Sequence, residues 1–229
     1  MVATRGVALV TGGNRGIGLE VGRQLAELGY TVVLGARDLA KGEAAAREAG
    51  AVACRLDVAD DASVLAAARW IEEAFGRCDA LVNNAAIHYD TWQRASTADL
   101  GVVHEALETN LFGAWRTTLA LLPLLRRAPH GRVVNVSSGA GSLAEMGAGT
   151  PAYRVSKAAL NALTRVLAAE LRADGVLVNA VCPGWTATDM GGGGGRPVAD
   201  GAASVVWGVT LDDDGPTGGF FRDGRALAY

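Results

Sequence analysis

A tyrosine and a lysine four positions apart give this chain a means of transferring protons. Tyr153 and Lys157 form a Tyr-x-x-x-Lys pattern, and on a helix these positions lie on one face, one turn apart. An ammonium group near a phenol favours the phenolate, so a tyrosine whose ordinary pKa is about 10 can exchange protons nearer to neutral pH. Only Lys41 and Lys157 are lysines among the 21 lysines and arginines. We therefore interpret the pair as catalytic; the alternative is an ordinary surface pair.

A glycine-rich turn near the start of the chain predicts a phosphate site. The sequence TGGNRGIG at positions 11–18 follows an apolar run and precedes an expected helix. Gly12, Gly16 and Gly18 would allow a tight turn, a close approach of the backbone to a pyrophosphate, and close packing of the helix on the strand. The first N–H groups of the helix are then free to bind the phosphates. The strand–turn–helix context favours a nucleotide site over an incidental glycine-rich turn.

The end of the second expected strand, at positions 31–35, distinguishes the two nicotinamide nucleotides. Enzymes that use NAD place an acidic residue there to bind the 2′-hydroxyl of the ribose. Here no acid ends the strand, and Arg37 follows it, with a planar guanidinium that suits a 2′-phosphate. Arg15, inside the glycine-rich turn, is a second cation. The sequence therefore predicts NADP(H); in the alternative, both arginines are surface charges and Asp38 binds the ribose.

Strands that alternate with helices are expected to position these residues. Apolar runs of strand length occur at positions 7–11, 31–35, 51–56, 80–83, 132–137, 176–182 and, more weakly, 219–222. Helical spacing of apolar residues is found between them, for example at 17–28 and 62–75. This alternation predicts an α/β fold with a Rossmann-like, doubly wound parallel sheet of about seven strands and helices on both faces. We expect residues 1–229 to form a single NADP-binding and catalytic domain.

Two segments rich in small residues follow the ends of expected strands. One spans positions 139–150, and the other spans 186–200 and contains five consecutive glycines at 191–195. Open α/β sheets bind ligands at the carboxyl ends of their strands. The segment near 186–200 is therefore predicted to be a mobile substrate loop; the alternative is a surface linker.

The motifs, taken in order from Thr11 to Met190, resemble the short-chain dehydrogenase/reductase family, whose members carry Thr-Gly-x-x-x-Gly-x-Gly and Tyr-x-x-x-Lys. Within that family, the segments at 33–38, 182–190 and 215–223 look like those of carbonyl reductases. The resemblance implies an NADPH-dependent reduction of an aldehyde or ketone to an alcohol. It leaves two alternatives: a 3-oxoacyl thioester reductase of the same family, and an NADP(H)-binding regulator without turnover.

The resemblance also implies the roles of individual residues. The catalytic set would be Asn110, Ser138, Tyr153 and Lys157. Ser138 would hydrogen-bond the substrate carbonyl, and Asn110 would hold a water that relays protons to Lys157. Ser137 is the adjacent candidate for the serine. Neighbouring side chains on a strand point in opposite directions, so we expect only one of the two serines to face the site.

The cofactor-binding set implied by the resemblance follows the same loops. It comprises Gly12, Asn14, Arg15, Gly16, Ile17, Gly18, Arg37, Asp57, Val58, Asn84, Ala85, Tyr153, Lys157, Pro183, Gly184, Thr186 and Thr188. Ala86 stands where the family has glycine, and we expect a small local adjustment there. Trp185 and Met190 are candidates to line the substrate pocket, with His88, Trp92 and Met146 as weaker ones; ordinary packing is the alternative for each aromatic.

Composition excludes several other classes of protein. The net charge is −3 and the basic residues are scattered, which argues against a nucleic-acid partner. No apolar stretch is long enough to span a membrane and no signal peptide is evident, so we expect a cytoplasmic protein that acts on a small carbonyl or alcohol substrate. Three widely spaced cysteines predict neither a disulfide framework nor a metal site. No Gly-x-Ser-x-Gly motif supports a hydrolase.

One segment known from some carbonyl reductases is missing. The chain lacks the long insertion before the catalytic tyrosine that covers helix faces used for dimerisation in that family. A monomer or a homo-oligomer, either dimer or tetramer, is therefore expected. The identity of the substrate is not fixed by these motifs, because the pocket is built from variable loops.

Overall fold

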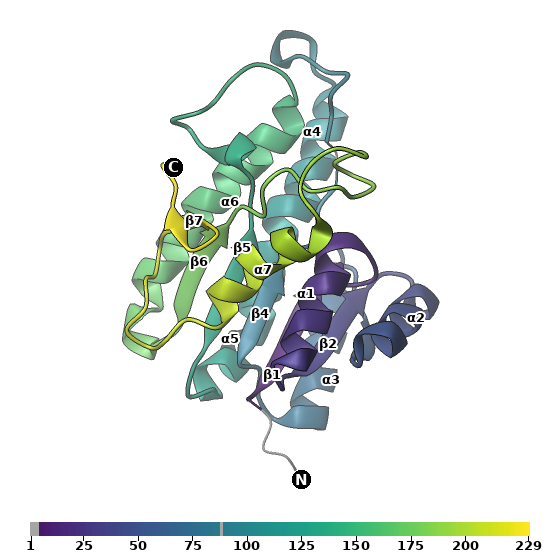
Figure 1. Ribbon diagram of the computed structural model, residues 1–229, viewed down its shortest axis with the longest axis vertical. Helices are drawn as coiled ribbons and strands as arrows, with labels where there is room; N and C mark the ends of the chain where they lie inside the picture. Colours follow the sequence, from purple (N-terminus) through teal and green to yellow (C-terminus); the bar gives the residue numbers. More distant parts are fainter. Residues whose placement is uncertain (1–4, 88) are drawn as a thin grey trace.

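A single eight-stranded sheet runs through the molecule (Figure 1). The computed structural model describes residues 5–87 and 89–229. The strands are β1 (Val7–Thr11), β2 (Thr31–Ala36), β3 (Val52–Arg55), β4 (Ala80–Asn83), β5 (Arg132–Val136), β6 (Leu177–Val181), β7 (Phe220–Arg222) and β8 (Arg225–Ala226), in the order β3-β2-β1-β4-β5-β6-β7-β8. The first seven are parallel and β8 is antiparallel to β7. The predicted doubly wound parallel sheet is confirmed, with β8 as an additional strand.

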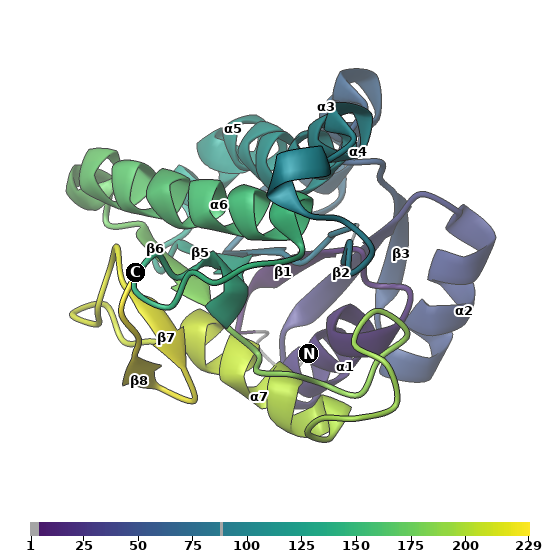
Figure 2. The same cartoon turned by 90° about the horizontal axis from the view of Figure 1, so that it is seen from above.

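Helices cover both faces of the sheet (Figure 2). On one face lie α1 (Gly16–Glu27), α2 (Leu39–Ala49) and α7 (Val198–Val209); on the other lie α3 (Asp61–Phe75), α4 (Leu100–Leu107), α5 (Gly113–Arg127) and α6 (Pro151–Glu170). Short helical turns are η1 (Ala95–Thr97), η2 (Glu108–Phe112), η3 (Gly139–Gly141) and η4 (Arg172–Asp174), of which η2 is a π-helix.

The central strands are mostly apolar because both of their faces are covered. Every residue of β1, β4, β5 and β6 is buried. Leu9 belongs to the core cluster packed against α3, α5 and α6, whereas its neighbour Val10 belongs to the cluster packed against α1, α2 and α7. Alternation of this kind along a strand divides the apolar side chains between two cores, and it explains the continuous apolar runs of the sequence.

The order of the strands creates a crevice at one edge of the sheet. Strand β1 lies between β2 and β4, so the chain winds outward from β1 in both directions. Ligands of doubly wound sheets bind at this switch point, outside the carboxyl ends of the strands. The glycine-rich turn follows β1 and Asn84 follows β4, so both predicted elements meet there.

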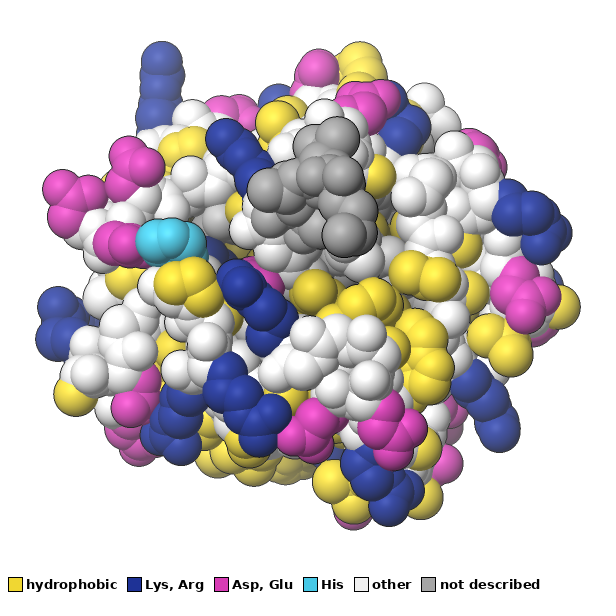
Figure 3. Space-filling model, turned by 90° about the horizontal axis from the view of Figure 1, so that it is seen from below, with side chains coloured by type: hydrophobic (Ala, Val, Ile, Leu, Met, Phe, Trp, Pro, Cys, Tyr) yellow, Lys and Arg dark blue, Asp and Glu magenta, His cyan; other side chains and the backbone are white. Residues whose placement is uncertain are grey.

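The opposite face, at the amino ends of the strands, carries basic and acidic side chains in a mixed pattern (Figure 3).

Within the described residues, no helix combines the length and apolar character required to cross a bilayer. In the same part of the chain, no group of three His, Cys, Asp or Glu side chains is arranged to hold a metal ion. Cys54, Cys78 and Cys182 are free and buried.

Candidate active site

The glycine-rich turn adopts a conformation that only glycine tolerates well. Gly12 and Gly16 have φ angles of +64° and +55°, in the left-handed region. A Cβ on Gly18 would lie 2.4 Å from Nδ2 of Asn84 and 2.5 Å from the carbonyl oxygen of Gly12. The N-cap residue of α1, Arg15, makes no side-chain capping bond, and the first turn holds no acidic residue. The first N–H groups of α1 are therefore available to an anion.

Asn84 fastens this turn to the end of β4. Its Nδ2 donates to the carbonyl oxygens of Thr11 at 2.9 Å and Gly12 at 3.2 Å. The backbone N–H groups of Asn84 and Ala85 both donate to Oγ1 of Thr11 at 3.0 Å. Ala86 is not among the residues with positive φ, so alanine fits this position without backbone strain.

A cavity of about 400 Å³ lies along the carboxyl ends of the strands. Of the predicted cofactor-binding residues, all except Gly184 and Thr186 line it. The sequence motifs did not single out several other lining residues: Leu56, Ile87, Thr109, Val136, Ala187 and Asp189. Each of these lies within two positions of a predicted residue, so proximity along the chain was the available signal. A cavity lined by residues from several strand ends, with a free helix N-terminus on its wall, fits a dinucleotide.

Two arginines lie on the wall of the cavity where the 2′-phosphate of NADP(H) is expected. Arg15 and Arg37 both line it. The Nη1 atom of Arg15 is 2.7 Å from a carboxylate oxygen of Asp189. Asp38, the alternative ribose ligand, instead caps α2 by accepting a hydrogen bond from the N–H of Lys41 at 3.2 Å. The cationic groups present therefore fit a 2′-phosphate better than a 2′-hydroxyl.

Helix α6 carries Tyr153 and Lys157 to the same cavity. Lys157 is only 2% exposed, and its Nζ donates to the carbonyl oxygen of Val136 at 2.8 Å. It lies 5.7 Å from the centroid of the Tyr153 ring. Burial lowers the pKa of Lys157 to about 8 and raises the pKa of Tyr153 to about 12. The net shift of the Tyr153 pKa is therefore away from the phenolate, and in the protein alone the hydroxyl keeps its proton at neutral pH.

Ser138 and Ser137 point to different surroundings. A side-chain hydrogen bond from Ser138 lowers the pKa of Tyr153, against the effect of burial. Ser137 is 2% exposed and lines the cavity, and its hydroxyl has no hydrogen-bond partner among the described residues. Ser138 is thus the serine that acts on the pKa of Tyr153, whereas Ser137 and not Ser138 is among the residues that line the cavity. Which of the two serines faces a bound substrate stays a prediction.

Asn110 lies in the π-helix η2, between α4 and α5. Its Oδ1 accepts from the N–H of Ile87 at 2.8 Å, and its Nδ2 donates to the carbonyl oxygen of Ile87 at 3.1 Å and to Oγ of Ser156 at 3.0 Å. Single π-turns inside α-helices are frequent at functional sites. Asn110 thus joins the loop after β4 to α6, and its predicted water-holding role stays a prediction.

The predicted substrate-lining residues lie in different surroundings. All four described candidates are exposed, and of these only Met190 lines the cavity; the other three are Trp185, Trp92 and Met146. His88 lies outside the described residues. Tyr89, which the motifs did not reveal, packs edge to face against Tyr153 with ring centroids 5.2 Å apart. A partly exposed aromatic ring therefore borders the ring of Tyr153.

The glycine run folds against Trp185. A Cβ on Gly194 would lie 2.9 Å from the indole, and a Cβ on Gly195 would lie 2.5 Å from the carbonyl oxygen of Trp185. The indole N–H donates to the carbonyl oxygen of Gly191 at 2.8 Å. The glycines therefore allow close packing around the tryptophan and are not merely a linker.

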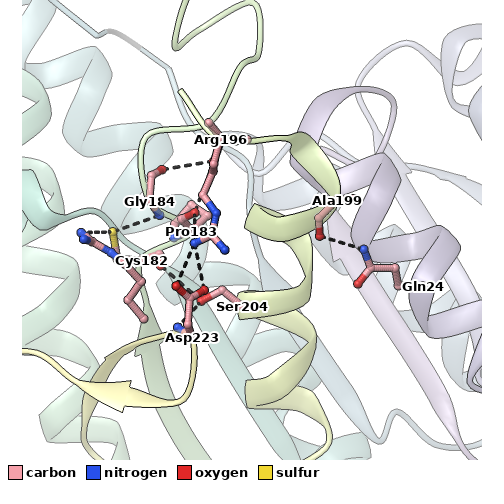
Figure 4. Close-up of polar contacts among 10 residues, drawn as sticks. Gln24, Cys182, Pro183, Gly184, Arg196, Ala199, Ser204 and Asp223 are labelled. Carbon is pink, nitrogen blue, oxygen red and sulfur yellow. Dashed lines mark hydrogen bonds and ion pairs between the residues drawn. The ribbon is translucent and has the colours of Figure 1, made fainter. Parts of the chain in front are cut away.

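The base of this segment is fixed by Arg196 (Figure 4). Its N–H donates to the carbonyl oxygen of Trp185 at 2.8 Å. Its Nη1 lies 2.9 Å and 3.0 Å from the two carboxylate oxygens of Asp223, in the turn between β7 and β8. Residues 198–200, which we expected to belong to the loop, form the first turn of α7. Mobility of the segment 186–197 stays a prediction.

Comparison with known proteins places this geometry among reductases. A model of the short chain dehydrogenase family matches residues 6–195. The chain is 33% identical to (-)-isopiperitenone reductase of Mentha piperita, with 100% of this chain and 99% of the relative covered. It is 34% identical to carbonyl reductase (NADPH) 3 of Mus musculus, with 95% and 96% covered. The structure of NADPH-bound carbonyl reductase from chicken fatty liver matches with a TM-score of 0.88 at 30% identity, over 100% of both chains.

The two relatives also differ from this chain in length. Their alignments span 315 and 270 residues, compared with the 229 residues of this chain. They therefore contain segments that this chain lacks, and the absence of an insertion before Tyr153 stays a prediction.

Proposed function

The chain belongs to the short-chain dehydrogenase family, and we propose that Ser138, Tyr153 and Lys157 carry out its catalysis. It is an NADP-dependent carbonyl reductase of the short-chain type that reduces an aldehyde or a ketone to an alcohol. The assignment of the catalytic residues rests on how they gather at one cavity. Lys157 and Tyr153 line one cavity with Arg15 and Arg37, and Ser138 lies near enough to lower the pKa of Tyr153 against the effect of burial.

Each residue has a distinct task in the proposed reaction. NADPH, when bound, supplies the hydride that reduces the carbonyl carbon. Ser138 donates a hydrogen bond to the carbonyl oxygen as negative charge develops on it. Tyr153, whose raised pKa keeps it protonated, donates the proton to that oxygen. Lys157, beside the resulting phenolate, stabilises its negative charge.

Apolar side chains near the catalytic tyrosine favour an apolar carbonyl compound as substrate. Tyr89 packs on Tyr153, Met190 lines the cavity, and Trp185 stands on the adjoining segment. Aromatic and thioether side chains offer large contact areas to apolar ligands. A 3-oxoacyl thioester reductase remains the alternative within the family. A regulator without turnover is expected to lose Tyr153 or Lys157, and this chain keeps both.

The test is cofactor oxidation, followed by the near-ultraviolet absorbance of reduced nicotinamide. NADPH and NADH are each mixed with apolar ketones, small aldehydes and an oxoacyl thioester. Oxidation of NADPH by apolar ketones supports the proposal, and selective oxidation by the thioester supports the alternative. Tight NADPH binding without reduction of any carbonyl would support a regulator. A cytoplasmic location and a monomeric or homo-oligomeric state stay predictions from the sequence.

Replacing Arg37 by leucine is expected to weaken NADPH selectively. Charge-assisted hydrogen bonds contribute about 1.5–3 kcal/mol, so KM for NADPH should rise by roughly 10- to 100-fold while KM for NADH stays unchanged. The measurement is the pair of KM values at a saturating carbonyl concentration. Arg47→Leu is the control, because Arg47 is an exposed arginine on helix α2, which follows Arg37, and it does not line the cavity. An equal loss with both nucleotides would remove the 2′-phosphate role from Arg37.

A further inference from the structure

The helix that carries the catalytic tyrosine begins without a cap of its own. Thr150 occupies the N-cap position of α6, and its side chain makes no capping hydrogen bond. Its φ of +44° lies in the left-handed region, which is costly for a β-branched residue. Helix starts leave several N–H groups without a partner inside the helix. The first-turn donors of α6 therefore need an acceptor from elsewhere in the chain.

Asp90 supplies that acceptor from the loop after β4. One carboxylate oxygen accepts from the N–H of Ala152 at 3.0 Å, and the other accepts from the N–H of Tyr153 itself at 3.1 Å. Asp90 is 0% exposed. Burying a carboxylate is costly unless it is hydrogen-bonded, and two N–H donors at the positive end of a helix provide that compensation.

Neighbouring contacts hold Asp90 in place from the other side. Nε2 of Gln93 donates to Asp90 at 3.2 Å, while Oε1 of Gln93 accepts from the N–H of Asp99 at 2.7 Å. Asp99 in turn caps α4 by accepting from the N–H of Gly101 at 2.8 Å. The first turns of α4 and α6 are thus joined through Gln93 and Asp90.

The same loop contacts the tyrosine ring. Tyr89 packs against the ring of Tyr153, and Asp90 binds the backbone N–H of that residue. Upstream, Ile87 is held through both its N–H and its carbonyl by Asn110. The loop therefore contacts Tyr153 at its ring and at its backbone, close to the site of proton transfer.

We propose that Asp90 is a positioning residue that fixes the first turn of α6 and, through it, the hydroxyl of Tyr153. This inference rests on the proposed function of Tyr153. A local cap at position 150 would satisfy the helix alone, whereas a cap from the loop after β4 also ties the tyrosine to the loop that borders the substrate. A carboxylate suits this task because both of its oxygens only accept hydrogen bonds.

The experiment uses Asp90→Asn, which keeps the shape of the side chain but turns one acceptor into a donor, and Asp90→Ala. Asp60→Asn is the matched control, because Asp60 caps α3 through the N–H of Ala62 at 2.9 Å. We measure kcat, KM for the carbonyl, the NADPH dissociation constant by fluorescence, and hydrogen exchange of the first turn of α6.

Both Asp90 variants should exchange the amides of Ala152 and Tyr153 faster than the wild type. Their kcat should fall by about 10- to 100-fold, since a small misplacement of a catalytic group has effects of this size, with NADPH binding unchanged. Asp60→Asn should keep the wild-type kcat. Faster exchange with unchanged kcat, or a parallel loss of NADPH binding, would overturn the proposal.

The exchange measurement keeps this inference separate from the proposed function. If the wild type reduces no carbonyl compound, the proposed function fails. If the amides of Ala152 and Tyr153 exchange in Asp90→Asn at the wild-type rate, Asp90 does not fix the first turn of α6, whatever the activity. If Asp90→Ala does not fold, the isosteric Asp90→Asn decides the question by its kcat.

Discussion

Tyr153→Phe is expected to lower kcat by about 10²- to 10⁴-fold, the usual contribution of a positioned general acid. The substitution removes one hydroxyl and keeps the ring that packs against Tyr89. Burial holds the pKa of Tyr153 at about 12, so in the wild type the hydroxyl is protonated and ready to donate at neutral pH. Phenylalanine cannot donate a proton, and the alkoxide formed by reduction must then find a proton elsewhere.

NADPH binding should change much less than kcat. Of the predicted cofactor-binding groups only the Tyr153 hydroxyl is removed, so the NADPH dissociation constant measured by fluorescence should rise by less than about 10-fold, the effect of one hydrogen bond. Tyr30→Phe is the control: it removes the same hydroxyl from a residue packed against the core on the α1, α2 and α7 side of the sheet. A Tyr153→Phe enzyme with wild-type kcat would assign the proton donor to another group.

The fold was predictable because its signals are local and repeated. Strands buried on both faces appear as mostly apolar runs, as in β1. The turn after β1 needs glycines for reasons that act within a few residues of each other, namely positive φ at Gly12 and Gly16. The two-residue strand β8 escaped prediction, because a strand so short leaves almost no periodicity in the sequence.

The site was predictable where it depends on short motifs, and not where it depends on contacts between distant segments. Tyr153 and Lys157 are one helical turn apart, so their association follows from spacing. Asp90 reaches Tyr153 from 63 positions away, and no local pattern distinguishes it from a surface acid. The need for glycine at positions 194 and 195 comes from their contact with Trp185, which exists only in the folded segment.

The pKa shifts of Tyr153 and Lys157 were likewise predictable only in part from the sequence. The spacing of Tyr153 and Lys157 gives the sign of their mutual effect, in which the ammonium favours the phenolate. The direction of the net shift depends on how deeply each group is buried, and burial is a property of the whole fold. In the structure it raises the pKa of Tyr153 and lowers that of Lys157.

Lys157→Met should abolish activity and also stabilise the protein without cofactor. Lys157 is almost fully buried, and its Nζ donates to the carbonyl oxygen of Val136. Its pKa falls from 10.5 to about 8, which corresponds to a cost of about 3 kcal/mol for keeping the ammonium buried. Methionine fills similar space without charge. After a loss of about 1 kcal/mol for the unpaired carbonyl of Val136, the free energy of unfolding at neutral pH should rise by about 2 kcal/mol.

The pH dependence of this gain identifies its cause. Below pH 8 the lysine holds its proton in both the folded and unfolded states, so the destabilisation of the wild type is complete. Between pH 8 and 10.5 the unfolded state binds more protons than the folded state, and wild-type stability rises with pH. The difference between Lys157→Met and the wild type in urea unfolding should therefore shrink across this window. Lys41→Met replaces the other lysine, which is exposed on α2, and should show neither the gain nor its pH dependence. If Lys157→Met is less stable than the wild type at neutral pH, the surroundings compensate the buried ammonium. Tyr153 then lies beside a charge whose burial costs little free energy.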